Sequence, residues 1–266
     1  MFAKLLRYEW RASRGLVGLL CAIIGVSSLL SGGIARYMTW SVVTGNRFMV
    51  SVYSSVLSVA VLAIAGCCVG AMYLLVYRFY TGRFTDQGYL MMTLPVTAHQ
   101  HMLSCLTNTV IGVLVVAVTA VVCVTAGVSI FLSSFEQDAV ADMLYIFEDV
   151  AKNLEAYFDT NGILVSLVVG GLIAIFLTDI LSLMLALTVG AHAAKHPVLK
   201  GAVLYIGLDV VVNEINSFIS PWANRQFSGF SVGEVNVLTT LLLYTVTAVV
   251  CYYATHQILE NKLNLA

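Results

Sequence analysis

Acidic and amide side chains occur inside segments of this chain that are otherwise almost wholly apolar. The clearest are Asp179 and, further along, Asp209, Asn213 and Asn216, which are spaced by four and three residues. That spacing places the last three on one face of a helix. A carboxylate in lipid costs roughly 2.5–3.5 kcal/mol, so such groups are expected to face protein or water and are candidates for a functional site.

Three interpretations of this polar face remain open. It could line a translocation path, or it could form an interface with a second membrane protein. Alternatively, residues 211–232 could re-enter the membrane as broken helices covered by protein. Glu214 lies beside the face, and Asp179 follows Thr178, a pair that we interpret as hydrogen-bonding between helices, with a proton relay as the alternative.

Other reactive residue types are present without a convincing arrangement. His192 and His196 have the spacing of two metal ligands on a helix, but no third ligand is apparent and Pro197 is expected to end that helix. We find no nucleophile–histidine arrangement, no HExxH motif and no GxxxxGK[ST] phosphate-binding loop. The sequence therefore predicts no metal, no cofactor and no catalytic activity in this chain.

The composition requires a lipid environment. The 266 residues are 60% hydrophobic and 10% charged, with a mean hydropathy of +0.93, whereas about a quarter of the residues of soluble domains are charged. A net charge of −1 without a basic stripe argues against binding of nucleic acid. The six cysteines all lie in apolar segments without a CxxC spacing, which indicates packing residues: Cys21, Cys67, Cys68, Cys105, Cys123 and Cys251.

The elements that must position the polar residues are long apolar segments. About 20 apolar residues cross a bilayer as a helix, and these segments lack the two-residue alternation of strands. We therefore predict an all-α integral membrane protein with one domain, residues 1–266. Six segments are predicted to span the membrane: 15–35, 50–77, 102–132, 161–190, 201–219 and 235–256.

Lysine and arginine predict the orientation of these spans. With the N-terminus inside, nine basic residues face the cytoplasm and four face the exterior. Both termini are then cytoplasmic, and 133–160 becomes an acidic extracellular segment, interpreted as an amphipathic helix. The inner residues are Lys4, Arg7, Arg11, Arg14, Arg78, Arg83, Lys195, Lys200 and Lys262; the outer ones are Arg36, Arg47, Lys152 and Arg225.

Residues 1–14 predict an amphipathic helix at the membrane interface. Apolar residues from Phe2 to Trp10 fall on one face, and a basic face opposite them suits anionic headgroups. A signal peptide with a basic n-region and an apolar h-region at Leu16–Leu30 is the alternative. In the second span, Gly66 and Gly70 form a GxxxG motif, which predicts close helix packing within the chain. The basic face consists of Lys4, Arg7, Arg11 and Arg14.

Residues 78–101 form the longest predicted cytoplasmic loop. Thr85 or Asp86 can cap a short helix, Pro95 is expected to end it, and Thr97 can begin the helix of the third span. A simple connection needs only a handful of residues. This loop also carries aromatic and aliphatic side chains beside charges, which suits a protein contact, although a loop lying on the membrane surface is the alternative.

The segment "FTDQGYLMMTLPVTAHQ" resembles the connection between the second and third spans of ABC-2-type permeases of Gram-positive bacteria. Gln87 stands where that family usually has an acid, and Cys105 where it usually has Lys. The basic N-terminus resembles the family's elbow helix, and "YYATHQILENKLNL" is similar to its cytoplasmic end. The matching positions are Phe84, Thr85, Asp86, Gly88, Tyr89, Leu90, Thr93, Leu94, Pro95, Val96 and Ser104.

The resemblance implies a permease subunit in the bacterial plasma membrane, most simply of an exporter. A coupling helix in the loop would contact a separate ATPase subunit, which would bind ATP and Mg²⁺, and a second permease, identical or related, would complete the transporter. The implied contact residues are Phe84, Thr85, Asp86, Gly88, Tyr89, Leu90, Leu94 and Pro95. The alternatives are an ion-coupled secondary transporter that uses Asp179 or Asp209, and a non-transporting sensor or immunity subunit.

Overall fold

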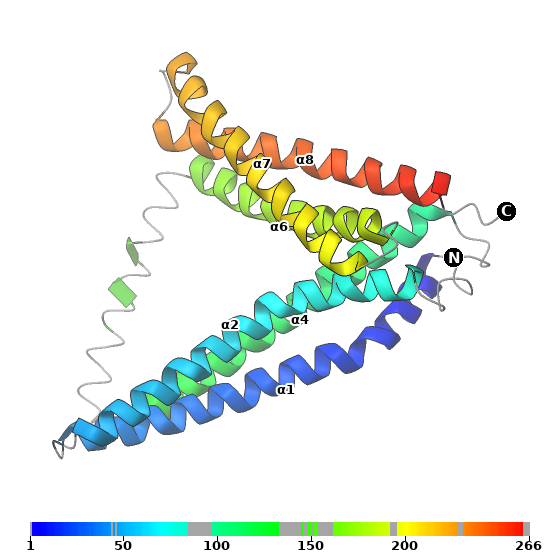
Figure 1. The fold of residues 1–266 in the computed structure, drawn as a ribbon. Coiled ribbons are helices and arrows are strands. Elements are labelled where there is room, and N and C mark those ends of the chain that lie inside the picture. Colours follow the sequence, from blue (N-terminus) through cyan, green and yellow to red (C-terminus); the bar gives the residue numbers. More distant parts are fainter. Residues whose placement is uncertain are drawn as a thin grey trace. The chain divides into compact units, whose positions relative to one another are not determined.

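The chain folds into long helices, shown in Figure 1. The computed structural model describes residues 2–43, 45, 47–84, 97–132, 145, 148–149, 152–153, 162–191, 196–227 and 231–262. Within these residues there is no strand, as predicted for an all-α protein. The helices are α1 (Phe2–Val43), α2 (Arg47–Phe84), α4 (Ala98–Leu132), α6 (Gly162–Ala191), α7 (Pro197–Gln226) and α8 (Val232–Lys262).

Each of the six predicted spans falls on one of these helices, apart from residue 161, which lies outside the described residues. Five helices, α1, α2, α4, α6 and α8, are long and apolar enough to cross a membrane, which confirms a membrane-type helical protein. The fifth predicted span, α7, does not reach that apolarity because Asp209, Asn213, Glu214 and Asn216 interrupt it.

Local sequence explains where several helices begin. Gly45 adopts a φ of 71° between α1 and α2, a left-handed conformation that glycine tolerates. Thr97 caps α4, because its Oγ1 accepts a hydrogen bond from the amide of Gln100 at 3.4 Å. Ser231 and Glu234 form a reciprocal capping box at the start of α8, with bonds of 3.2 and 3.0 Å. The predicted role of Thr97 is confirmed.

Two compact units divide the chain, and they are described separately. The N-terminal unit comprises Ala3–Leu75 and Thr107–Asn153, and the C-terminal unit comprises Met1–Phe2, Val76–Leu106 and Leu154–Ala266. Helices α2 and α4 each contribute to both units.

The core of the N-terminal unit is built from α1, α2 and α4. Val17, Leu20 and Ile24 of α1 pack with Ala71 and Leu75 of α2 and with small residues of α4. Four of the six cysteines pack against this core, and all six are free thiols, which agrees with their predicted packing role. They are Cys21, Cys67, Cys68 and Cys123.

A close helix contact in the N-terminal unit involves a different pair of glycines from the predicted motif. A Cβ added to Gly32 of α1 would lie 2.5 Å from the carbonyl oxygen of Gly127 in α4. By contrast, a Cβ on Gly66 or Gly70 would meet no atom within 4 Å. The prediction that the GxxxG motif packs closely within the chain is therefore wrong.

In the C-terminal unit, α6 packs against both α7 and α8, and α7 packs against α8. The second half of α6 is buried, from Thr178 to Gly190 with few interruptions. At its end a Cβ on Gly190 would lie 2.5 Å from the carbonyl oxygen of Pro197, so the start of α7 lies directly against the end of α6. This half of α6 is the centre of the unit.

Two boundary predictions need correction. The predicted elbow helix 1–14 is not separated from the first span, because α1 is continuous from Phe2 to Val43. Pro197 does not end a helix; it occupies the first turn of α7, and His196 precedes it with a left-handed φ of 52°. A proline fits the first turn because its missing N–H would have no partner there. Residues 192–195 lie outside the described residues.

Candidate functional site

The predicted polar face of α7 is paired with a second polar row on α8. We call this set of side chains the polar ladder. On α7 it consists of Asp209, Asn213, Asn216, Ser220 and Asn224, and on α8 of Asn236, Thr239, Thr240 and Tyr244. The interpretation of residues 211–232 as broken helices is not supported, because α7 is continuous as far as Gln226.

Hydrogen bonds run along the ladder over the C-terminal half of α7 and the N-terminal half of α8. Asn224 Nδ2 donates to Asn236 Oδ1 at 2.7 Å, and Asn216 Nδ2 donates to Thr240 Oγ1 at 3.4 Å. The Ser220 and Thr239 hydroxyls lie 3.5 Å apart. The polar groups of α7 thus bond to those of α8.

At its far end the ladder meets α6. The Tyr244 hydroxyl donates to Asn213 Oδ1 at 3.2 Å, and Asn213 Nδ2 donates to Asp209 Oδ1 at 3.1 Å. Thr178 of α6 donates its hydroxyl proton to the Tyr244 carbonyl oxygen at 2.8 Å. The predicted interhelical hydrogen bond near Asp179 is therefore made by its neighbour Thr178.

Four of these side chains form the candidate site: Asp179 of α6, Asp209 and Asn213 of α7, and Tyr244 of α8. Asp179 follows Thr178, which bonds to the Tyr244 carbonyl oxygen. The Tyr244 hydroxyl bonds to Asn213, and Asn213 bonds to Asp209. Asp179 is half-buried and Asp209 is exposed on the surface of the chain. Two carboxylates, an amide and a phenol can bind a cation, exchange protons, or bind polar groups of another protein.

A metal centre is not formed by these residues. In the part of the chain that the structure describes, no three histidine, cysteine or acidic side chains are placed to hold a metal ion. His196 precedes α7 and is not part of a helix. His192 and His196 therefore do not form the pair of metal ligands on one helix that the sequence suggested.

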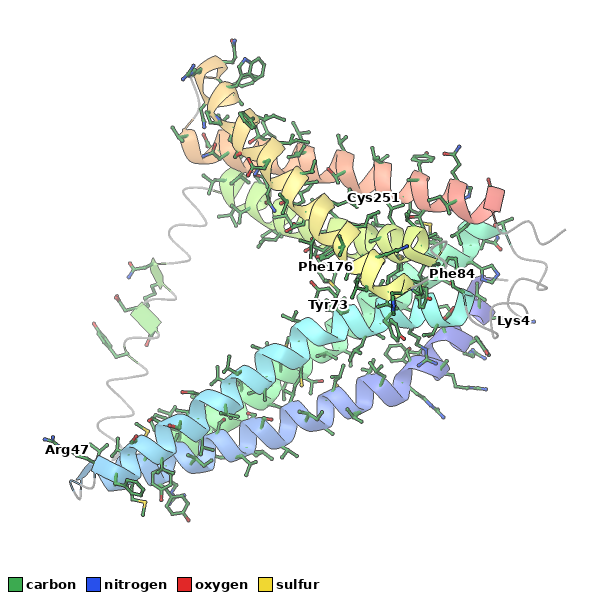
Figure 2. The ribbon with its side chains drawn as sticks, in the orientation of Figure 1. Lys4, Arg47, Tyr73, Phe84, Phe176 and Cys251 are labelled. Carbon is green, nitrogen blue, oxygen red and sulfur yellow. The ribbon has the colours of Figure 1, made fainter. Side chains whose placement is uncertain are left out.

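The predicted ATPase-contact loop is described only at its two ends. Phe84, the last residue of α2 (Figure 2), stacks on Tyr80 with ring centroids 5.8 Å apart and meets the edge of Phe79 at 6.3 Å. Thr85–Pro95, which contain the other predicted contact residues, lie outside the described residues. The aromatic cluster therefore fixes where the loop begins.

The first turn of α4, which follows this loop in the chain, contacts α8. The His99 ring in the first turn of α4 hydrogen-bonds through Nδ1 to the Tyr252 hydroxyl, and it packs edge-on against His256 at 6.1 Å. His256 Nε2 lies 3.5 Å from Glu260 Oε1. The start of α4 and the C-terminal end of α8 thus lie together in the C-terminal unit.

The basic face predicted at the N-terminus is confirmed as an exposed face. Lys4, Arg7, Arg11 and Arg14 are all exposed, whereas Leu5 on the opposite side is buried. Its contact with headgroups stays a prediction. In the acidic segment, Glu148 pairs with Lys152 at 2.8 Å, one helical turn apart, and most of residues 133–160 lie outside the described residues.

Sequence reasoning missed the α8 half of the ladder. Asn236, Thr240 and Tyr244 recur every four residues in the last span, which is the spacing of one helix face. The same spacing extends the α7 row from Asn216 to Ser220 and Asn224. The pairing of His99 with Tyr252 had no such signal, because the two residues are 153 positions apart.

We compared the chain with models of protein families, with curated proteins and with solved structures, and none of them matches it.

Proposed function

We propose that this chain is the membrane-spanning permease subunit of an ATP-driven ABC transporter, in the direction of export. The observation that carries the proposal is the segment "FTDQGYLMMTLPV". It begins at Phe84, the last residue of α2, and ends immediately before Thr97, the cap of α4. Both helices are long and apolar enough to span a membrane. The segment thus connects two spans, as the coupling segment of the permeases it resembles does.

The anchoring of this segment at both ends supports a mechanical role. Phe84 packs into an aromatic cluster at the end of α2, and His99 holds the start of α4 to Tyr252 near the end of α8. A push on residues 85–96 would therefore be passed to α2, α4 and α8 together. A loop that served only as a tether would not need these contacts.

We assign ATP binding to a separate subunit. The chain has no phosphate-binding loop, so the ATPase, with its ATP and Mg²⁺, is a partner protein that contacts residues 84–95. This chain would then be a non-catalytic subunit that pairs with a second permease. In this arrangement both termini and residues 84–95 face the cytoplasm.

We include α7 as the sixth span. Its 30 residues extend about 45 Å, more than the roughly 30 Å of a bilayer core. It lies against α6 at the Gly190–Pro197 contact, and near its other end Asn224 bonds to Asn236 of α8. Because α6 and α8 are candidate spans, a helix packed along both of them is best placed in the membrane with them.

The candidate site gives this permease a polar feature at membrane depth. Asp209 and Glu214 are exposed on α7, and an acid in lipid costs roughly 2.5–3.5 kcal/mol. We propose that this face lines the translocation path or contacts the second permease, because either position replaces lipid with water or protein.

The test is recovery of an ATPase with the tagged protein from native membranes in mild detergent, identified by mass spectrometry. We expect the wild-type protein to retain an ATPase subunit, and Gly88→Arg and Tyr89→Asp to lose it while still inserting into the membrane. Tyr145→Asp is the matched control, since Tyr145 is exposed and lies in the predicted extracellular segment.

Retention of an ATPase by both loop variants would contradict the proposed contact. Transport by the purified chain alone, driven by an ion gradient without ATP and abolished by Asp209→Asn, would instead identify a secondary transporter that uses the candidate site.

A further inference from the structure

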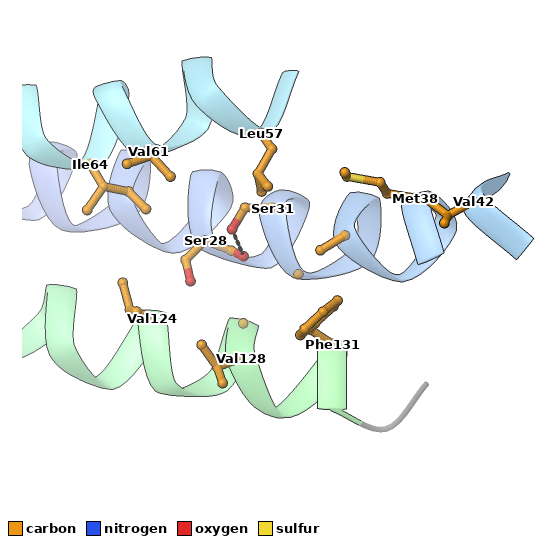
Figure 3. Close-up of a pocket in the computed structure, with 13 residues that line it drawn as sticks. Ser28, Ser31, Met38, Val42, Leu57, Val61, Ile64, Val124, Val128 and Phe131 are labelled. Atoms are coloured by element: carbon orange, nitrogen blue, oxygen red, sulfur yellow. Dashed lines mark hydrogen bonds between the residues drawn. The ribbon is translucent and has the colours of Figure 1, made fainter. Parts of the chain in front are cut away.

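A cavity of about 650 Å³ lies within the N-terminal unit, between α1, α2 and α4. Figure 3 shows its lining, which comes from all three helices: Met38 and Val42 of α1, Leu57 and Val61 of α2, and Val128 and Phe131 of α4. Its volume is in the range of small-molecule sites, which is roughly 300–1,000 Å³. No charged side chain contributes to the lining.

Small residues of α1 and α4 leave this space unfilled. Gly32 and Gly127 both line the cavity and bring the two backbones together. Ser28, Ser31 and Ala35 also line it, and none of these side chains is large enough to reach across to α2. The cavity therefore follows from the same short side chains that allow α1 and α4 to approach.

The hydroxyl groups of the two lining serines already donate hydrogen bonds to backbone carbonyl oxygens. Ser31 Oγ donates to the Ser28 carbonyl oxygen at 2.7 Å, and Ser28 Oγ donates to the carbonyl oxygen of Cys123. An ordered water would need two to four polar partners, which the remaining aliphatic and aromatic lining cannot supply. The chemistry of this cavity thus suits a hydrocarbon.

Apolar lining atoms gain dispersion contacts from an apolar occupant. Val61 and Val128 are 57% and 43% exposed, so the lining reaches the outer surface of a unit whose helices can all span a membrane. Hydrocarbon from the bilayer can therefore fill the cavity. At this end of the unit, exposed Arg47 in the first turn of α2 provides a cation that suits a phosphate.

We propose that this cavity binds an acyl chain of a membrane phospholipid, with Arg47 near its headgroup. The inference does not depend on the proposed function, because it rests only on residues of α1, α2 and α4 in the N-terminal unit. It adds a structural lipid to the N-terminal unit, held more firmly than the surrounding bilayer lipids.

Native mass spectrometry of the full-length protein, after washing in mild detergent, tests this assignment. We expect the wild-type protein to retain a phospholipid and Val61→Trp, which fills the cavity, to lose it to the background level. Val59→Trp is the matched control and should retain it, because Val59 is 66% exposed on the same helix and does not line the cavity.

A second pair keeps the test decisive if Val61→Trp fails to fold. Val128→Trp fills the cavity from α4, and Val121→Trp changes an exposed valine of α4 outside it. Adding phosphatidylglycerol to delipidated wild-type protein should restore the bound mass. Restoration by oleic acid and not by phosphatidylglycerol, or equal lipid retention in all variants, would overturn the proposal.

Discussion

The two units hold their helices together by different means. In the N-terminal unit, α1 and α4 are joined by Gly32 against Gly127 and by single hydroxyl or thiol bonds, such as the 3.5 Å contact of Cys21 Sγ with Thr119 Oγ1. In the C-terminal unit, α7 and α8 are joined by a row of hydrogen bonds between amide, hydroxyl and phenol groups.

This difference follows from how apolar and polar helix surfaces are stabilised in a membrane. Lipid is as apolar as leucine, so apolar helices gain stability from close packing and not from the hydrophobic effect. The N-terminal unit packs α1 closely against α4 through glycines. Where the side chains of α1 and α4 are too short to reach α2, a cavity remains. The C-terminal unit has polar groups on both α7 and α8, and the hydrogen bonds between them join the two helices. We therefore expect the first unit to be sensitive to size and the second to loss of bonding partners.

The largest effect expected is from Gly32→Ala. Its Cβ would lie 2.5 Å from a backbone oxygen of Gly127, so the two helices must separate, at a cost of about 1–3 kcal/mol. Gly33→Ala is the matched control, since a Cβ there meets nothing within 4 Å and the helix gains up to about 1 kcal/mol of propensity. Thermal unfolding in detergent measures both. Equal melting temperatures would show that the glycine contact does not determine the packing of this unit.

An intermediate effect is expected at the Asn224–Asn236 pair. Replacing either residue with leucine removes a 2.7 Å bond between α7 and α8, and we expect a loss of about 1 kcal/mol. The double variant should lose less than the sum, because the interaction is shared. Ser217→Ala is the control, since Ser217 bonds only within α7, to the Glu214 carbonyl oxygen. Strict additivity of the two changes would argue against the ladder as a stabilising element.

The smallest effect is expected for Tyr244→Phe, which keeps the ring and removes the bond to Asn213 Oδ1. A single bond of this kind in a membrane protein contributes about 0.6 kcal/mol on average. Tyr253→Phe on the same helix, where the side chain is 67% exposed, should change the unfolding free energy less. If Tyr253→Phe has the larger effect, Tyr244 does not hold α7 to α8 through its hydroxyl.

Features that depend on neighbouring residues were predictable. The polar spacing of Asp209, Asn213 and Asn216 predicted one helix face, and all three lie on the continuous helix α7. That Asn213 and Asn216 bond to α8 was not predicted. Thr97 was recognised as a cap because capping involves residues only a turn away. The role of Pro197 was wrong because a proline both follows helices and begins them, and the sequence alone does not distinguish the two.

Composition and periodicity by themselves determined that this is a helical membrane-type protein and where its long helices lie, because the solvent and the local hydrogen bonds of a helix act on every segment independently. Only the tertiary structure decided that the close glycine contact is Gly32 with Gly127 and does not involve the Gly66–Gly70 motif. It also decided that Asn213 links Tyr244 of α8 to Asp209 of α7, and that a cavity remains between α1, α2 and α4. Apolar helix surfaces in lipid are nearly equivalent to one another, so their partners are selected by the shapes and bonds of residues far apart in the chain.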